Sequence, residues 1–131
     1  MQIGEVAERT ALSLRAIRYY GEVGLVTPSA RSQGGFRLYT EADVERLLLV
    51  KRMKPLELSL EEMADLLSIL DQIDKARPAE QAGLRERLSM YEHAAQARCA
   101  ALREQLASAQ DFAARLRHAR DAARKKESNQ R

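Results

Sequence analysis

The stretch SLRAIRYY, residues 13–20, decides the fold of this chain. Ser13 can cap the amino end of a helix, because its hydroxyl oxygen can accept a hydrogen bond from a backbone N–H of the first turn. Before it, apolar residues spaced three and one apart predict a short helix over residues 3–9. Only a brief connection, residues 10–13, separates the two. The pattern therefore predicts a helix-turn-helix whose second helix runs from residue 14 to about residue 23.

Composition narrows the class of protein. The chain has 131 residues, of which 31% are charged and 5% aromatic. It is rich in alanine, leucine, glutamate and arginine, and these residues favour helices over strands. A net charge of +3 is compatible with nucleic-acid binding, although many soluble proteins are as basic. The sequence has no nucleophile with a nearby base, no glycine-rich phosphate loop and no metal-ligand set, and its single cysteine, Cys99, cannot form an internal disulfide. We therefore expect neither an enzyme nor a bound metal or cofactor.

A hairpin is expected directly after the helix-turn-helix. Gly24 is suited to end the second helix, because glycine readily adopts the left-handed conformation found after helices. Leu25–Val26 and Phe36–Tyr39 then have the composition of short strands. They flank the polar, glycine-bearing segment Ser29–Gly35. The sequence thus predicts a β-hairpin, a candidate wing, with this segment at its tip.

Two further helices follow the hairpin. Thr40 with Asp43 is close to a capping box and opens the first of them, which Pro55 ends. Ser59 with Glu62 is a second capping box and opens the next helix. The apolar stripe of that helix consists of Leu60, Met63, Ala64, Leu66, Leu67 and Leu70. The head of the molecule is therefore predicted to hold four helices and a hairpin.

A single long helix is predicted after a polar hinge at residues 71–78. From residue 79 to about residue 126 the chain has no proline and only one glycine, which allows a helix of roughly 70 Å. An apolar line follows one side of it in steps of four and three, with one doubled step of four. The line consists of Leu84, Leu88, Tyr91, Ala95, Cys99, Leu102, Leu106, Ala109, Ala113 and Leu116. Since one chain supplies only one such helix, we expect two copies to pair through it as a homodimer.

The second helix of the helix-turn-helix has a basic outer side. Arg15, Arg18 and Tyr19 are three and four residues apart, so they share one face. Guanidinium and phenol groups on that face can reach the phosphates and base edges of DNA. The phase of Tyr20 places it either beside them or turned inward. The residues expected to face the core are Leu14 and Ile17.

The hairpin extends this basic surface. The side chains expected to contribute are Arg31, Gln33 and Arg37. Gly34 and Gly35 lack side chains, which would let the backbone approach DNA closely. Over residues 13–39 four arginines stand against one acid, Glu22. An ordinary solvated face is the alternative, but the position of the cluster after a helix-turn signal favours contact with DNA.

Residues 2–70 resemble the DNA-binding domain of the MerR family of bacterial transcription regulators. The matching segments are IGEVA at 3–7, SLRAIRYY at 13–20, GL at 24–25, GFRLYT at 35–40 and DVERL at 43–47. They cover about half of the chain in the family's order. Gly21, where the family has an acidic residue, and Pro55 depart from the pattern. The resemblance implies a mainly α fold, with a winged helix-turn-helix head followed by one long coiled-coil helix.

The resemblance also implies contacts and a mechanism. The residues that it implies are Arg15, Arg18, Tyr19 and Tyr20 in the helix, Arg37 and Tyr39 in the wing, and Lys54 in a second wing at residues 53–55. It further implies that the coiled coil is antiparallel. Proteins of this family bind a dyad in double-stranded promoter DNA and, when activated, bend and untwist it, which acts indirectly on RNA polymerase. Readout of DNA shape would then contribute much of the specificity.

Other functions stay open. An architectural or recombination-directionality DNA-binding dimer is the main alternative, since such proteins can use the same head, and a coiled-coil adaptor that has lost DNA binding is a third. Metal-sensing members of the family carry cysteines at the start of the dimer helix and in a loop beyond it, and this chain has none there. Cys99 is expected to be a packing residue, with a redox role as the alternative. No small-molecule effector is assigned.

The expected organisation is a DNA-binding head at residues 1–70, the hinge at 71–78, the dimerisation helix at 79–126 and a polar tail at 127–131. No apolar run approaches the roughly 18 residues of a membrane span, and no signal-peptide core follows Met1. We therefore expect a cytoplasmic protein without membrane contact. Because the chain ends almost where its helix does, we expect no fused ligand-binding domain.

Overall fold

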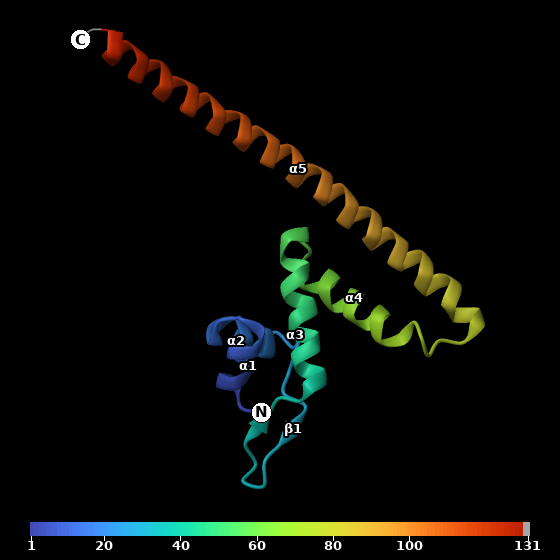
Figure 1. Cartoon of the computed structure of the whole chain (residues 1–131). Helices are drawn as coiled ribbons and strands as arrows, with labels where there is room; N and C mark the ends of the chain where they lie inside the picture. The colour runs from blue at the N-terminus through green and yellow to red at the C-terminus, as the bar shows by residue number, and fades with distance from the viewer. Residues whose placement is uncertain (130–131) are drawn as a thin grey trace. The chain divides into compact units, whose positions relative to one another are not determined.

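The computed structural model describes residues 1–129, and its fold is mainly helical, as predicted (Figure 1). Its elements are α1 (Ile3–Thr10), α2 (Leu14–Glu22), β1 (Ala30–Arg31), β2 (Arg37–Leu38), α3 (Glu41–Met53), the 3₁₀ helix η1 (Lys54–Leu56), α4 (Leu60–Gln72) and α5 (Pro78–Asn129). They form two compact units, and the first of these extends from Met1 to Glu92. It therefore includes the first turns of α5.

The predicted helix starts are confirmed by their caps. The Ser13 hydroxyl accepts a hydrogen bond from the Ala16 N–H at 3.0 Å and opens α2. Thr40 with Asp43, at the start of α3, and Ser59 with Glu62, at the start of α4, form complete capping boxes. In each box the side chain of either residue accepts a hydrogen bond from the backbone N–H of the other. Two N–H groups that have no partner within the helix are therefore bonded.

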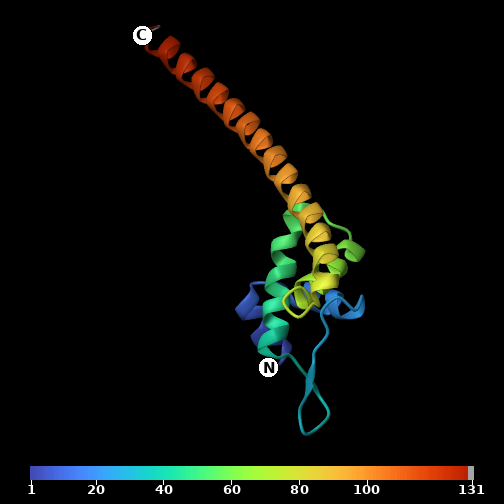
Figure 2. The same ribbon diagram turned by 90° about the vertical axis from the view of Figure 1, so that its right-hand side faces the viewer.

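The first predicted strand was wrong. Leu25 and Val26 form no strand; both of their N–H groups donate to the carbonyl oxygen of Tyr20, and both side chains are buried. The hairpin is shorter and lies later in the chain, with Ala30 opposite Leu38 and Arg31 opposite Arg37. An apolar pair that follows a helix resembles a strand in sequence, but here it folds back to cover the core. The hairpin itself extends away from the helices of the head (Figures 1 and 2).

One hydrophobic cluster holds the head together. Val6 of α1, Ile17 of α2 and Leu47 of α3 are fully buried in it. Leu14 was expected beside Ile17 but is 41% exposed, because it is the first residue of α2 and lies outside this cluster. The three helices thus pack around residues that the helical spacing of their sequence brings to one side.

On α4 the apolar stripe is also broader than expected. Leu70 was expected to be buried but is 38% exposed, whereas Ile69, outside the predicted stripe, is 1% exposed. Ile69 follows Asp65 by four residues and so shares its side of the helix, and Asp65 contacts α5. α4 therefore buries two sides, one against the core and one toward α5.

Asp43 ties the hairpin to α3. Its Oδ2 atom accepts hydrogen bonds from the Ser29 N–H at 3.0 Å, the Ser29 hydroxyl at 2.8 Å and the Thr40 N–H at 2.9 Å. Burial by itself raises the pKa of Asp43, but the hydrogen bonds from Thr40 and Ser29 outweigh it, so the pKa lies below its ordinary value. The folded state thus favours the charged carboxylate.

Replacing Asp43 with asparagine is expected to lower the free energy of unfolding by about 1–3 kcal/mol, because a neutral amide bonds these donors less strongly. In the parent protein the stabilisation is complete above the unfolded-state pKa of about 3.9 and is lost as pH falls through the lower folded-state pKa. Urea unfolding at pH 7 and pH 3 measures both effects. Asp74→Asn, at an exposed position, is the control, and equal stabilities of the two variants would contradict the role of Asp43.

The long helix was predicted over residues 79–126 and is confirmed as α5, which opens on Pro78. Proline suits this position because its missing N–H would have no partner in the first turn of a helix. The predicted hinge is shorter than expected, since α4 reaches Gln72. Within residues 1–129, none of the helices combines the length and the apolar character that a membrane span requires.

Candidate nucleic-acid interface

The two faces of α2 have opposite roles. Ile17 is 0% exposed and Tyr20 is 4% exposed, so both face the core. Arg15, Arg18 and Tyr19 are exposed on the other side, as their spacing predicts. Because the core residues anchor the helix from behind, the outer side chains are presented on a rigid element.

Three adjoining clefts extend this face to both sides. A cleft of about 540 Å³ lies between α2 and the hairpin, and Arg18, Phe36 and Arg37 are among its lining residues. A second cleft of about 350 Å³ lies between α2 and η1 and includes Arg15 and Lys54. A third, on α2 itself, joins them. Its lining residues are Arg15, Arg18, Tyr19 and Glu22.

The structure therefore brings together predicted residues from three elements. Lys54, Arg15, Arg18 and Arg37 follow one another along the clefts, and we call these four residues the basic strip. Within residues 1–129, no ion pair engages any of them, whereas Arg9, Arg46, Arg87 and Arg120 are each paired with an acid. Among the described residues that line these three clefts, Glu22 is the one acid. The strip thus offers positive charge that no ion pair among the described residues neutralises.

Tyr39 supports the proximity of the wing to α2. Burial raises the pKa of Tyr39, as does the charge of Asp43, while Arg37 and Arg18 act in the opposite direction. Both arginines are therefore close enough to influence the same phenol. Arg18 belongs to α2 and Arg37 to β2, so the two elements present their charges together.

Two of the residues predicted to contact DNA are buried in the core. Tyr20 and Tyr39 were expected to touch DNA, but their side chains are 4% and 6% exposed and belong to the hydrophobic cluster. Tyr20 follows Ile17 by three residues, which turns it inward. We assign both tyrosines to packing. Tyr19, 45% exposed, remains on the outer face, with its ring 5.8 Å from that of Tyr20.

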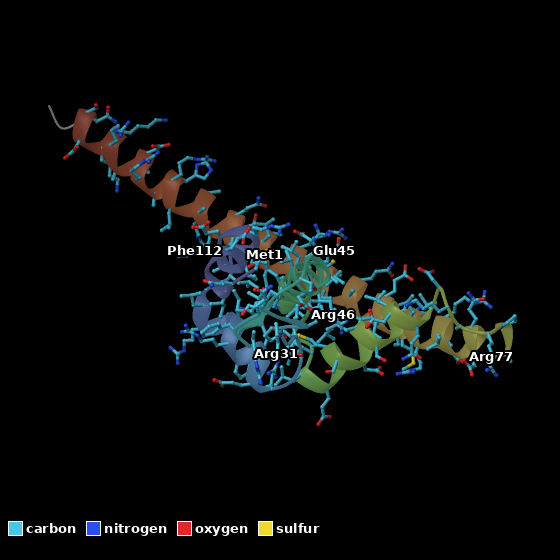
Figure 3. The ribbon with its side chains drawn as sticks, turned by 90° about the horizontal axis from the view of Figure 1, so that it is seen from below. Met1, Arg31, Glu45, Arg46, Arg77 and Phe112 are labelled. Atoms are coloured by element: carbon cyan, nitrogen blue, oxygen red, sulfur yellow. The ribbon has the colours of Figure 1, made fainter. Side chains whose placement is uncertain are left out.

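The hairpin tip places the remaining predicted residues at the surface. Arg31, Gln33 and Gly35 are all exposed, and Arg31 is labelled in Figure 3. The Ser32 N–H donates to the Phe36 carbonyl at 2.8 Å and closes the turn. Gly35 has φ of +83°, a conformation that side chains with a Cβ rarely adopt, so a glycine is required there.

Phe36 is a surface residue that the sequence did not single out. It is 73% exposed at the hairpin and lines the cleft beside Arg18 and Arg37. The available signal was a large apolar residue between Gly35 and Arg37 in an otherwise polar loop. An exposed aromatic ring that lies among arginine side chains can pack against the sugars of a nucleic-acid backbone.

The predicted dimer line divides into two parts. Its first member, Leu84, is already buried within the single chain, and the Tyr91 hydroxyl donates to Asp65 of α4 at 2.7 Å. Farther along, Leu102, Leu106 and Leu116 are 36%, 58% and 57% exposed. Phe112, outside the predicted line, is 61% exposed (Figure 3). Much of the exposed apolar surface of α5 therefore lies beyond the first compact unit.

No group of three or more histidine, cysteine or acidic side chains that could hold a metal ion occurs within the described residues. Cys99 is exposed in the single chain.

Residues 1–69 match the sequence pattern of the family described as MerR HTH family regulatory protein. The chain belongs to the MerR family. Its members are transcription regulators and not enzymes, as the sequence predicted. The matched residues include α1, α2, the hairpin and η1, and so the whole basic strip.

Similar proteins include two curated regulators. The transcriptional regulator CueR of Salmonella typhimurium is 39% identical over 71 residues, which are 54% of this chain and 51% of that protein. The mercuric resistance operon regulatory protein of Bacillus cereus is 37% identical over 76 residues, 58% of this chain and 57% of that protein. The chain thus spans about half the length of the curated relatives that it matches.

Two solved structures are similar over more of the chain. A MerR family transcriptional regulator from Listeria monocytogenes has a TM-score of 0.65 at 26% identity, covering 86% of this chain and 81% of that one. The regulator PbrR691 of Ralstonia metallidurans, solved in complex with lead(II), has a TM-score of 0.54 at 29% identity, with 81% and 82% covered.

Proposed function

We propose that this protein is a transcription regulator that binds a promoter dyad as a homodimer and deforms the DNA to control RNA polymerase. The observation that supports it best is the basic strip, a row of four basic side chains on α2, the hairpin and η1 that form no ion pair within residues 1–129. Contacts of such basic side chains to DNA phosphates supply affinity and fix the register of the protein on the duplex, and contacts to the edges of the nucleobases supply sequence specificity. Promoter DNA as the partner places the protein in the cytoplasm.

Each element of the basic strip suits a different contact with DNA. A helix of the size of α2 fits the major groove of DNA, where Arg15, Arg18 and Tyr19 can reach base edges and phosphates. The hairpin, with Arg31, Gln33, Gly35 and Arg37, then lies along the neighbouring backbone, and Lys54 holds the backbone on the other side of α2.

The dimer is supported by the apolar surface of α5. A helix of 52 residues cannot bury one side against so small a head, and its exposed leucines need a partner helix of the same kind. Self-pairing places two heads on one DNA, which suits a dyad. We propose residues 1–70 as the DNA-binding head, the linker between Gln72 and Pro78 as the hinge, and residues 79–126 as the dimerisation helix, with dimer contacts that begin beyond Tyr91. Of the predicted tail at 127–131, the residues up to Asn129 continue α5, and 130–131 lie outside the described residues.

A transcription assay distinguishes a regulator from an architectural DNA-binding dimer. The two hypotheses share DNA binding and dimerisation, but only a regulator changes the output of a particular promoter. Run-off transcription from a bound promoter, with and without the protein, is expected to show a change. A bound but unaffected promoter would favour the architectural dimer.

Replacing Arg18 with alanine is expected to weaken operator binding about tenfold or more, through loss of one charged contact in each protomer. If both contacts are to phosphate, the slope of log K against log salt falls in magnitude by about 1.8, or about 0.9 for each contact. Fluorescence anisotropy over a salt series measures both quantities.

The control for this substitution is Arg115→Ala, which removes an exposed arginine from α5. It is expected to leave the affinity and the salt slope unchanged. An Arg18→Ala protein with the parent's slope would remove Arg18 from the phosphate contacts.

A further inference from the structure

Asp65 of α4 holds two successive turns of α5. Its Oδ2 atom accepts a hydrogen bond from the Tyr91 hydroxyl at 2.7 Å, and its Oδ1 atom forms an ion pair with the Arg87 guanidinium. Arg87 and Tyr91 are four residues apart, so they lie on one side of α5. We call these three residues the Asp65 clasp. It lies wholly within the first compact unit, where α4 runs beside the start of α5 (Figure 1).

The clasp is polar and half-buried. The Asp65 and Arg87 side chains are 36% and 49% exposed. The hydrogen bond to Asp65 and, to a smaller extent, burial raise the pKa of Tyr91 to about 12, so its hydroxyl keeps its proton and donates at any physiological pH. Directional bonds of this kind restrict the angle between two helices more narrowly than apolar contact does.

A second ion pair continues the connection to the core. Arg46 of α3 pairs with Asp71 of α4 at 2.5 Å. α3 in turn contributes Val44, Leu47 and Val50 to the hydrophobic cluster that carries α2. The first turns of α5 are therefore joined to the DNA-facing helix through α4 and α3, each step held by named contacts.

We propose that Asp65, Arg87 and Tyr91 determine which half-site spacing the dimer accepts. This inference rests on the proposed function. Two heads joined by paired helices reach two half-sites only if each head is held at one angle to its own α5. One added base pair moves the second half-site by about 3.4 Å and turns it by about 34°. A rigid junction cannot follow that change, whereas a loosened junction can.

The test uses a set of operators that differ only in the spacer between half-sites, from two base pairs fewer to two more. The full-length parent protein is expected to bind its preferred spacer about tenfold or more tightly than spacers changed by one base pair. Tyr91→Phe, which keeps the ring, and Asp65→Asn are expected to reduce this preference to about threefold or less while binding the preferred spacer nearly as well.

Glu41→Gln is the matched control. It breaks the exposed ion pair between Glu41 and Arg9, at 2.6 Å, on a part of the head that does not involve α4 or α5. It is expected to keep the parent's spacing preference, and thermal unfolding checks that all variants are folded. If the parent discriminates and both clasp variants discriminate equally, the inference is overturned while the proposed function stands. If the parent binds no dyad at any spacing, the proposed function fails and the inference with it.

Discussion

Replacing Leu102 and Leu106 together with glutamate is expected to convert the protein to a monomer and to lower its affinity for an operator about a hundredfold or more. Both leucines are exposed in the single chain, at 36% and 58%, and lie on the predicted dimer line. Glutamate is a good helix former, so α5 itself should persist while like charges meet across the pair. Sedimentation velocity measures the mass, and anisotropy measures the affinity.

The matched control adds the same charge to another side of the same turns. Ala107 and Ser108 are exposed and lie well away from the dimer line, so Ala107→Glu with Ser108→Glu should leave the dimer and its operator affinity unchanged. A dimeric Leu102→Glu, Leu106→Glu protein would show that the chain associates through another surface.

Replacing Ile17 with alanine is expected to lower the free energy of unfolding of the head by about 2–4 kcal/mol. Ile17 lies on the buried side of α2, so its truncation leaves a cavity beneath the residues proposed to contact DNA. The four tyrosines all lie before residue 93, and the chain has no tryptophan, so tyrosine fluorescence during urea unfolding reports on the first compact unit.

Leu14→Ala is the control on the same helix. Leu14 is 41% exposed, so its truncation should cost about 1 kcal/mol or less. Equal losses for the two variants would contradict the assignment of Ile17 to the core and of Leu14 to the surface.

The local features of the fold were the ones that the sequence could predict. Ser13, Thr40 and Ser59 start their helices through bonds to residues three positions away, so the information for each start is contained in one turn of sequence. The length of α5 follows in the same way from the absence of helix-breaking residues, with Pro78 as its natural beginning.

Features that depend on distant residues were missed. Leu25 and Val26 have the composition of a strand, and only the folded head shows that they cover the core instead. Tyr20 has a phase that allowed two orientations, and the hydrophobic cluster decides between them. Asp65 meets Arg87 and Tyr91 across 22 and 26 residues, which no local spacing reveals.

The basic strip combines residues whose shared face the sequence predicts with residues that only the folded chain brings beside them. Arg15 and Arg18 share a face by helical spacing alone, so their part of the strip is visible in the sequence. Their proximity to Lys54 and Arg37 depends on how η1 and the hairpin pack beside α2, which the clefts establish. Phe36 was missed because an exposed apolar residue contradicts the usual relation between hydrophobicity and burial.

Hydroxyl-radical footprinting of the full-length protein on DNA selected from its own genome shows directly whether a dimer binds a dyad. We expect two protected half-sites related by a dyad, with centres a whole number of helical turns apart, and no such protection with the Leu102→Glu, Leu106→Glu protein. Failure of the parent protein to protect a dyad on any selected fragment, or protection of a single half-site by a monomer, would contradict this expectation.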